Sequence, residues 1–479
     1  MTVAGGAGVG PLLIPLLCAM AFAYVAWKRN RGEWAHPSRA LSVLYLALAL
    51  SSLVTPASAE PHLQSEPSWR TMLGYSALLS IALAPSLAIR RPPARAVVAN
   101  PLIVPAARWA WAPVGFAFGY LVPPALETFQ RGFSDTRELL NRYRGSPVPE
   151  GPLTTLAVAI SMFYLCFAIL AFASRARGLG SWTTAACAIG AGLAALHGSA
   201  FGARDGVLWA GFALLFAFWA MQPLSARLGG RGGRALAVLA LVGAMAYLGT
   251  ATRDRFAMKP GGYAGGTLMY FGAQPYVFEE TVQRTTDYFG FALRFPLLAS
   301  PNEYIERTEA YQWSFGTFLA DFFGVGGWPY AVGLTLGGAG LVWFGLWASH
   351  GRSALAYLLV AGLYTQFMFQ GAFYFRLGNR PGNIYHVLMF SGIGALVLFL
   401  PDRRSRPRDG RNGEFDSVRG LAVRVPPKKG PGRGSASAVR KASFEERDRP
   451  WEGATSGPAA DRPRPRMSGL SDHERSGIR

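Results

Sequence analysis

The sequence has few cysteines and few charged residues. Its three cysteines, Cys18, Cys166 and Cys187, all lie in apolar stretches. They are too few and too scattered for a disulfide framework or a thiolate metal site. Charged residues make up 15% of the 479 positions and hydrophobic ones 51%. A soluble chain of this length would fold as roughly three domains with charges mixed throughout. Here long apolar stretches alternate with short basic connectors, which predicts an all-α, polytopic membrane protein.

The apolar stretches predict eleven transmembrane helices. A helix needs about 20 mostly apolar residues to cross the hydrocarbon core. The stretches that meet this rule lie near 9–27, 40–58, 72–89, 109–126, 152–173, 181–202, 206–224, 235–252, 326–347, 354–373 and 383–400. No basic region precedes the first stretch, which favours an uncleaved helix over a signal peptide. We therefore expect a transmembrane domain over 1–400.

Lysine and arginine gather in the connectors that follow the odd-numbered stretches. These residues are Lys28, Arg29, Arg31, Arg39, Arg90, Arg91, Arg95, Arg175, Arg177, Arg227, Arg231, Arg234 and Arg352. The opposite connectors are less consistently basic; 59–71 holds Glu60, Glu66 and one arginine. Because short cytoplasmic loops carry an excess of positive charge, we expect these basic connectors inside and the N-terminus outside.

The segment 401–479 contains no apolar run of spanning length. It is rich in Arg, Gly, Pro, Ser and acidic residues, as in the stretch PPKKGPGR at 426–433. Such a composition cannot bury enough apolar area to offset the entropy of the chain. We expect a disordered, basic cytoplasmic tail. The net charge of +20 does not indicate nucleic-acid binding, because no nucleic-acid-binding fold interleaves these charges with aromatic residues.

The longest outer connector, 253–325, is dense in aromatic residues and cations. We expect it to fold on the membrane interface. Arg253, Arg255 and Lys259 lie within seven residues at the outer end of the eighth stretch, where they could grip a pyrophosphate through paired hydrogen bonds. The aromatic candidates for packing on sugar rings are Tyr263, Tyr270, Tyr311 and Trp313. The alternative is an interfacial belt of aromatics and cations, common in membrane proteins.

Two further segments supply candidates for acid/base chemistry. The connector between the tenth and eleventh stretches adds Arg376 and Arg380 to the candidate phosphate site. His386 follows it and is a candidate general base, since imidazole is largely uncharged at neutral pH; the alternative is a histidine bonded to a neighbouring helix. Asp321 is a second candidate, with a helix cap or a partner for a nearby arginine as the alternative.

Small and polar residues in the last three stretches predict packing features. The glycines at 324–327 favour a turn where the ninth stretch begins. Gly333, Gly337, Gly338 and Gly340 are expected to let helices approach closely. Gln366 and Gln370 share one helix face and are expected to bond to other helices.

The segments 253–280 and 311–343 resemble the late part of bacterial oligosaccharide repeat-unit polymerases of the O-antigen polymerase type. The matching features are a span ending in arginine, a Tyr…Pro…Phe stretch and a TF…DF…G block before a Gly-rich span. In this sequence they are Arg255, Tyr270, Pro275, Phe278, Thr317, Phe318, Asp321, Phe322, Gly324, Gly327, Gly337 and Gly338. Phe323 is an insertion relative to the family spacing.

The resemblance implies a function and a set of partners. The donor would be a glycan on polyprenyl pyrophosphate, and the acceptor would be a lipid-linked repeat unit. The protein would lie in the bacterial cytoplasmic membrane. A flippase and a chain-length regulator would be candidate partner proteins. The residues favour no cofactor, because the sequence has no His-x-x-x-His, no clustered cysteine and no nucleotide-binding glycine loop. A glycan ligase and a lipid-linked-sugar flippase remain the alternative functions.

Overall fold

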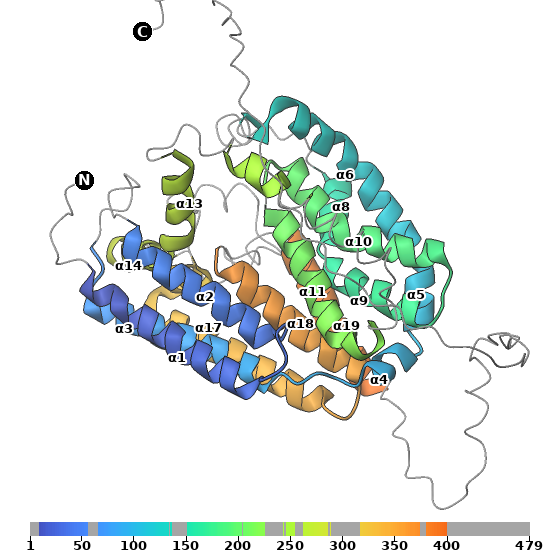
Figure 1. The fold of residues 1–479 in the computed structure, drawn as a ribbon, viewed down its shortest axis with the longest axis horizontal. Coiled ribbons are helices and arrows are strands. Elements are labelled where there is room, and N and C mark those ends of the chain that lie inside the picture. The colour runs from blue at the N-terminus through green and yellow to red at the C-terminus, as the bar shows by residue number, and fades with distance from the viewer. Residues whose placement is uncertain are drawn as a thin grey trace, which may run out of the picture. The chain divides into compact units, whose positions relative to one another are not determined.

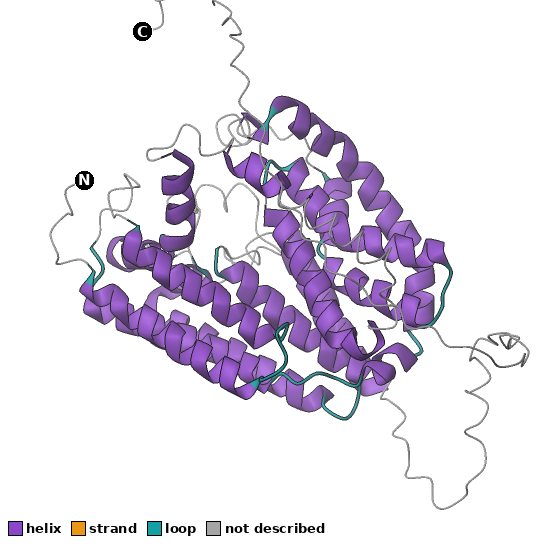
Figure 2. Cartoon of the chain, in the orientation of Figure 1, coloured by secondary structure: helices purple, strands orange, loops and turns teal. Residues whose placement is uncertain are grey.

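The computed structural model describes residues 9–55, 66–133, 135–136, 151–203, 205–225, 243, 246–253, 262–285, 288, 317–373 and 380–399. The described parts are helical and contain no strand (Figure 2). The chain divides into two compact units, Met1–Pro407 and Arg408–Arg479. The first unit holds every described helix. The predicted tail lies outside the described residues.

Within the described residues, six helices are long and apolar enough to cross a membrane, or seven if a bent pair counts as one span. The six are Gly10–Arg29 (η1, Gly10–Leu12, and α1, Leu13–Arg29), Pro37–Val54 (α2), Trp69–Ala88 (α3, Trp69–Leu83, and η3, Ala84–Ala88), Asp205–Gln222 within α11 (Asp205–Ser225), Phe318–Ser349 (α17) and Gly382–Phe399 within α19 (Arg380–Phe399). The bent pair joins α8, Pro152–Ser161, to α9, Tyr164–Ala176, at 50°. The protein is therefore an all-α membrane protein.

Other helices lie at predicted spans but fall outside those six. They are α6 (Trp111–Arg131), α10 (Ser181–Ala200) and α18 (Ala354–Gly371), each 18 residues or longer. Two short helices, α4 (Ala94–Ala99) and α5 (Ile103–Trp109), precede α6. Most of the predicted eighth span, 235–252, lies outside the described residues. The total of eleven spans stays a prediction.

The helices of the first unit form two groups with α18 between them (Figure 1). In one group α1, α2, α3 and α17 lie side by side. In the other, α10 packs on α6, α9 and α11, and α8 packs on α6. Helix α18 contacts α2 and α17 in the first group, α9 and α11 in the second, and also α19.

Side-chain hydrogen bonds fix α18 in this central position. The Tyr45 hydroxyl on α2 donates to the carbonyl oxygen of Met368 at 2.8 Å. The Tyr364 hydroxyl donates to the carbonyl oxygen of Ala82 on α3 at 2.7 Å. The prediction for the two glutamines is confirmed. Gln370 donates to the Tyr164 hydroxyl on α9 at 2.7 Å, and Gln366 accepts from the Tyr385 hydroxyl on α19 at 3.1 Å.

Several of the basic connectors meet at one end of the helices. Arg91 lies 3.4 Å from the carboxylate of Glu33 and donates to Gln222 at 2.8 Å. The backbone N–H of Arg90 donates to the Tyr357 hydroxyl at 2.8 Å, near the start of α18. Arg177 donates to the carbonyl oxygens of Val98 and Asn100, at the C-terminal end of α4. The connectors after α1, α3, α9 and α17 therefore share a face, as predicted.

The opposite end is closed by two helices from the predicted outer connector. They are α13, Gly262–Gly272, which packs on α2, and α14, Gln274–Arg284, which packs on α3 and α17. Glu279 on α14 is 1% exposed. Its carboxylate accepts from the backbone N–H and hydroxyl of Ser68 and from the hydroxyl of Thr71, at the N-terminus of α3. The positive end of the α3 dipole favours this carboxylate.

Removal of the Glu279 carboxylate is expected to loosen α14 from α3. Glu279→Ala should lower the free energy of unfolding by about 2–3 kcal/mol, because buried hydrogen bonds to a charged group are lost. Unfolding in detergent measures this. The control is Glu127→Ala, which breaks an exposed ion pair with Arg131 and should cost about 0.5 kcal/mol. Equal effects of the two variants would contradict the role of Glu279.

A second prediction concerns His36, which lies in the connector before α2 and is the N-cap residue of that helix. Its Nδ1 accepts from the backbone N–H of Ser38 at 3.2 Å, and its Nε2 lies 3.2 Å from the carbonyl oxygen of Ile89. Burial lowers the pKa of His36 to about 4. Because the unfolded chain titrates near pH 6.5, this stability is full above that pH and is lost between about pH 6.5 and 4.

The expected loss on acidification is about 3 kcal/mol. His36→Asn keeps a side-chain oxygen for the cap but does not titrate. The variant should therefore lose less stability than the wild type between pH 6.5 and 4.5, measured by unfolding in detergent at each pH. An identical loss in both proteins would show that another group carries the acid sensitivity.

Candidate functional site

Helix α17 begins at the end of the fold that carries α13 and α14. Thr317, not Asp321, holds the N-cap position, so the alternative that Asp321 is the cap residue is wrong. Asp321 lies in the first turn, where a carboxylate is favoured by the helix dipole. The helix breaks at Gly326 and Gly327, where the backbone is not helical. The predicted turn at 324–327 is confirmed.

Beyond the break, four glycines of α17 do not serve close helix packing in the described chain. A Cβ atom added at Gly333, Gly337, Gly338 or Gly340 would meet nothing within 4 Å in the described chain. The prediction that these glycines let helices approach is therefore wrong for the described residues. The hydropathy pattern marks a span here, but it does not reveal which face has a neighbour.

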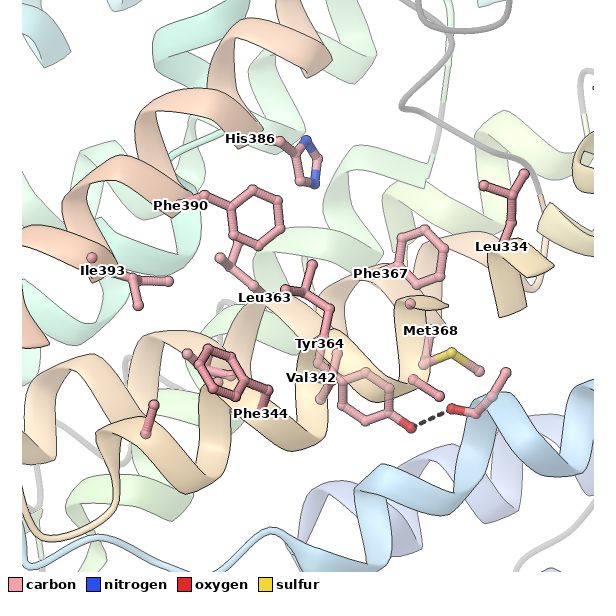
Figure 3. A pocket seen from close by; sticks show the side chains of 18 of the residues that line it. Leu334, Val342, Phe344, Leu363, Tyr364, Phe367, Met368, His386, Phe390 and Ile393 are labelled. Carbon is pink, nitrogen blue, oxygen red and sulfur yellow. Dashed lines mark hydrogen bonds between the residues drawn. The ribbon is translucent and has the colours of Figure 1, made fainter. Parts of the chain in front are cut away.

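The space beside α17 is part of a groove of about 660 Å³. The groove runs between α17 and α19, with α18 between them. Figure 3 shows His386, Phe390 and Ile393 on α19, Val342 and Phe344 on α17, and Leu363, Tyr364, Phe367 and Met368 on α18. Its lining is apolar apart from Thr335, Arg352, Tyr364 and His386. We call it the α17–α19 groove.

His386 lines this groove in the first turns of α19. Its Nδ1 lies 2.6 Å from the carbonyl oxygen of Gly382 in the same helix. A carbonyl can only accept, so Nδ1 carries the hydrogen and Nε2 holds the lone pair in the neutral ring. In the described chain the hydrogen bond of His386 is thus made within α19 and not to a neighbouring helix. Nε2 is the atom available to accept a proton.

Asp321 and His386 lie at the same end of the helices. Phe318 and Phe322, which flank Asp321 on α17, line the groove together with His386. Phe318 also packs against Phe367 of α18, with ring centroids 5.3 Å apart. The first turns of α17 and α19 therefore surround one end of the groove.

The remaining predicted site residues are only partly within the described chain. Arg253 is exposed at the end of the helical segment 246–253. Tyr270 on α13 packs against Phe373, at the end of α18, with ring centroids 5.2 Å apart. The side chains of Tyr263 and Arg380, and all of Arg255, Lys259, Arg376, Tyr311 and Trp313, lie outside the described residues. The predicted cation cluster therefore stays a prediction.

The acidic side chains of α14 have structural partners. Glu279 binds the N-terminus of α3, and Glu280 forms an ion pair with Arg284 one turn away. Among the described residues, no group of three or more His, Cys, Asp or Glu could hold a metal ion. Sequence reasoning missed both the groove and the role of Glu279. No local pattern signals either feature, because each depends on which helices meet.

The break in α17 generates a prediction. Gly327 has φ 75° and ψ −159°, a conformation that essentially only glycine adopts. An added Cβ would lie 2.8 Å from the Tyr288 hydroxyl. Gly327→Ala should therefore lower the free energy of unfolding in detergent by about 1–3 kcal/mol.

The matched control is Gly333→Ala, six residues along the same helix. Its Cβ meets open space, and alanine is the better helix former. This variant should be as stable as the wild type or more so. A Gly327→Ala protein that unfolds like Gly333→Ala would contradict the requirement for glycine at the break.

Comparisons with family models, with curated proteins and with solved structures gave no match.

Proposed function

We propose that the protein is a membrane glycosyltransferase that polymerises polyprenyl-pyrophosphate-linked oligosaccharide repeat units. The observation that carries the proposal is His386, an imidazole that lines an apolar groove between membrane helices. A lipid-linked sugar needs a reaction site that an apolar chain can reach from the bilayer. The groove offers that access, and the imidazole offers a proton acceptor beside it.

The proposed arrangement follows the positive-inside rule. The chain crosses the cytoplasmic membrane of a bacterium eleven times, with the basic connectors and the tail in the cytoplasm. The ends of α17 and α19 that hold Asp321 and His386 then face outward, together with α13 and α14. This is the side on which a surface polysaccharide would be assembled.

The reaction is a glycosyl transfer without a metal. An acceptor hydroxyl oxygen on the incoming repeat unit attacks the anomeric carbon of the donor glycan. The bond from that carbon to the diphosphate oxygen breaks, and polyprenyl diphosphate leaves with the electron pair. Nε2 of His386 takes the proton of the acceptor hydroxyl. The hydrogen bond from Nδ1 to the carbonyl oxygen of Gly382 leaves the lone pair on Nε2 for this step.

The departing diphosphate needs positive charge around it. Arg253, Arg255, Lys259, Arg376 and Arg380 are the groups proposed to stabilise the charge that grows on the leaving oxygen. Tyr263, Tyr270, Tyr311 and Trp313 are proposed to pack on sugar rings. Asp321, in the first turn of α17, is the second candidate for the base and is proposed to act if His386 does not.

Synthesis by purified full-length protein in vesicles tests the proposal. With a polyprenyl-diphosphate-linked repeat unit as substrate, the wild type should yield a ladder of lengthened glycans. His386→Gln should lower the rate by about 10²- to 10⁴-fold, the usual contribution of a general base. His350→Gln is the control, because His350 is exposed in the connector after α17, and it should synthesise at the wild-type rate.

The products also separate the alternatives. Transfer of one finished glycan to another acceptor would indicate a ligase, and movement across the bilayer without bond formation would indicate a flippase. Either result would overturn the polymerase assignment. A full-rate ladder from His386→Gln would remove His386 as the base and leave Asp321→Asn as the next variant to measure.

A further inference from the structure

The α17–α19 groove has two chemically different ends. His386 lines it near the first turn of α19, whereas Arg352 lines it beyond the last turn of α17. Among the described residues that line the groove, Arg352 is the only lysine, arginine, aspartate or glutamate. The half of the groove between Gly338 and Arg352 is otherwise apolar, with Phe344, Ala348, Val360 and Leu398 in its lining.

This half of the groove is open along its side. Phe344 on α17 is 61% exposed and Leu398 on α19 is 70% exposed in the described chain. In a membrane protein these exposed apolar side chains face hydrocarbon. An acyl chain can therefore enter from the bilayer without displacing any described helix. Gly394 also lines the groove, and a Cβ atom added there would meet nothing within 4 Å.

The length of this half corresponds to one leaflet. Gly338 and Ser349 are eleven positions apart on α17, which is roughly 16 Å at about 1.5 Å per residue. Half of a hydrocarbon core of about 30 Å is roughly 15 Å. The tail of a lipid whose headgroup lies at Arg352 would therefore end near Gly338. The part of the groove beside His386 would remain free for another chain.

We propose that this half-groove binds an anionic phospholipid, with the lipid phosphate at Arg352 and an acyl chain along Phe344, Val360 and Leu398. The guanidinium group supplies paired donors for phosphate oxygens. Arg352 belongs to the connector before α18, and the neighbouring basic connector reaches the same region through the bond from Arg90 to Tyr357. This is the basic face, and anionic lipids concentrate in the cytoplasmic leaflet.

The proposed lipid site differs from the proposed glycan site in the molecule that it binds and in the end of the groove at which it lies. The diphosphate of the proposed substrate would lie beside His386, at the opposite end of the groove from Arg352. A phospholipid at Arg352 would fill the inner half of the groove. The lipid site depends on the groove and on Arg352, and it holds whether or not the protein makes glycan bonds.

Native mass spectrometry of the full-length protein tests the proposal, with phosphatidylglycerol and phosphatidylcholine of identical acyl chains as probes. The wild type should retain phosphatidylglycerol over phosphatidylcholine by about five-fold, the effect of one arginine near the membrane surface. Arg352→Gln, a change at an exposed side chain, should bring the two lipids close to parity. Equal retention of both lipids by the wild type would overturn the proposal.

A pair of glycine variants on α19 tests the groove itself. Gly394 lines the groove, whereas Gly392 does not, and an added Cβ meets open space at both positions. Gly394→Trp should fill the half-groove and abolish the selective retention, while Gly392→Trp should keep it. If Gly394→Trp does not yield a monodisperse protein, Gly394→Leu replaces it. Undiminished retention in the groove variant would overturn the proposal, whatever the outcome of glycan synthesis.

Discussion

Hydrogen bonds from polar side chains join several pairs of helices in this protein. In a bilayer, apolar helices gain little by leaving lipid for one another, so interhelical hydrogen bonds and close packing direct association. Helix α18 takes part in four of these bonds. Through Tyr364, Gln366 and Gln370 it is joined to α3, α19 and α9, and the hydroxyl of Tyr45 joins it to α2. Helix α18 therefore joins the two groups of helices.

Polar and charged side chains join the helices at both ends of the fold, and the α17–α19 groove lies between those ends. Glu279 holds α14 to α3 at one end, and Glu33, His36 and Arg91 hold two connectors together at the other. Between these ends, α17 and α19 both pack against α18, and the groove lies between α17 and α19. The same helices that stabilise the fold thus leave an apolar groove with an imidazole at one end and a guanidinium group at the other.

The sequence predicts those features that are set by composition along a single helix. The apolar runs located most of the described spans, the spacing of Gln366 and Gln370 indicated interhelical bonds, and the glycines at 324–327 indicated the break. It does not predict features that depend on neighbours: Glu279 has no local signature as a partner of α3, and Gly338 was expected to contact a helix but faces the groove. Of the candidate site, His386 is described at the groove, whereas most of the predicted arginine cluster lies outside the described residues.

The central claim is that the space between α17 and α19 is a lipid-binding groove with two distinct ends. The most direct measurement is an electron cryomicroscopy map of the wild-type protein in nanodiscs that contain phosphatidylglycerol and phosphatidylcholine. The account predicts continuous density along Phe344 and Leu398 that terminates in a headgroup at Arg352. A map in which α17 and α19 pack directly against each other, with no density between them, would contradict it.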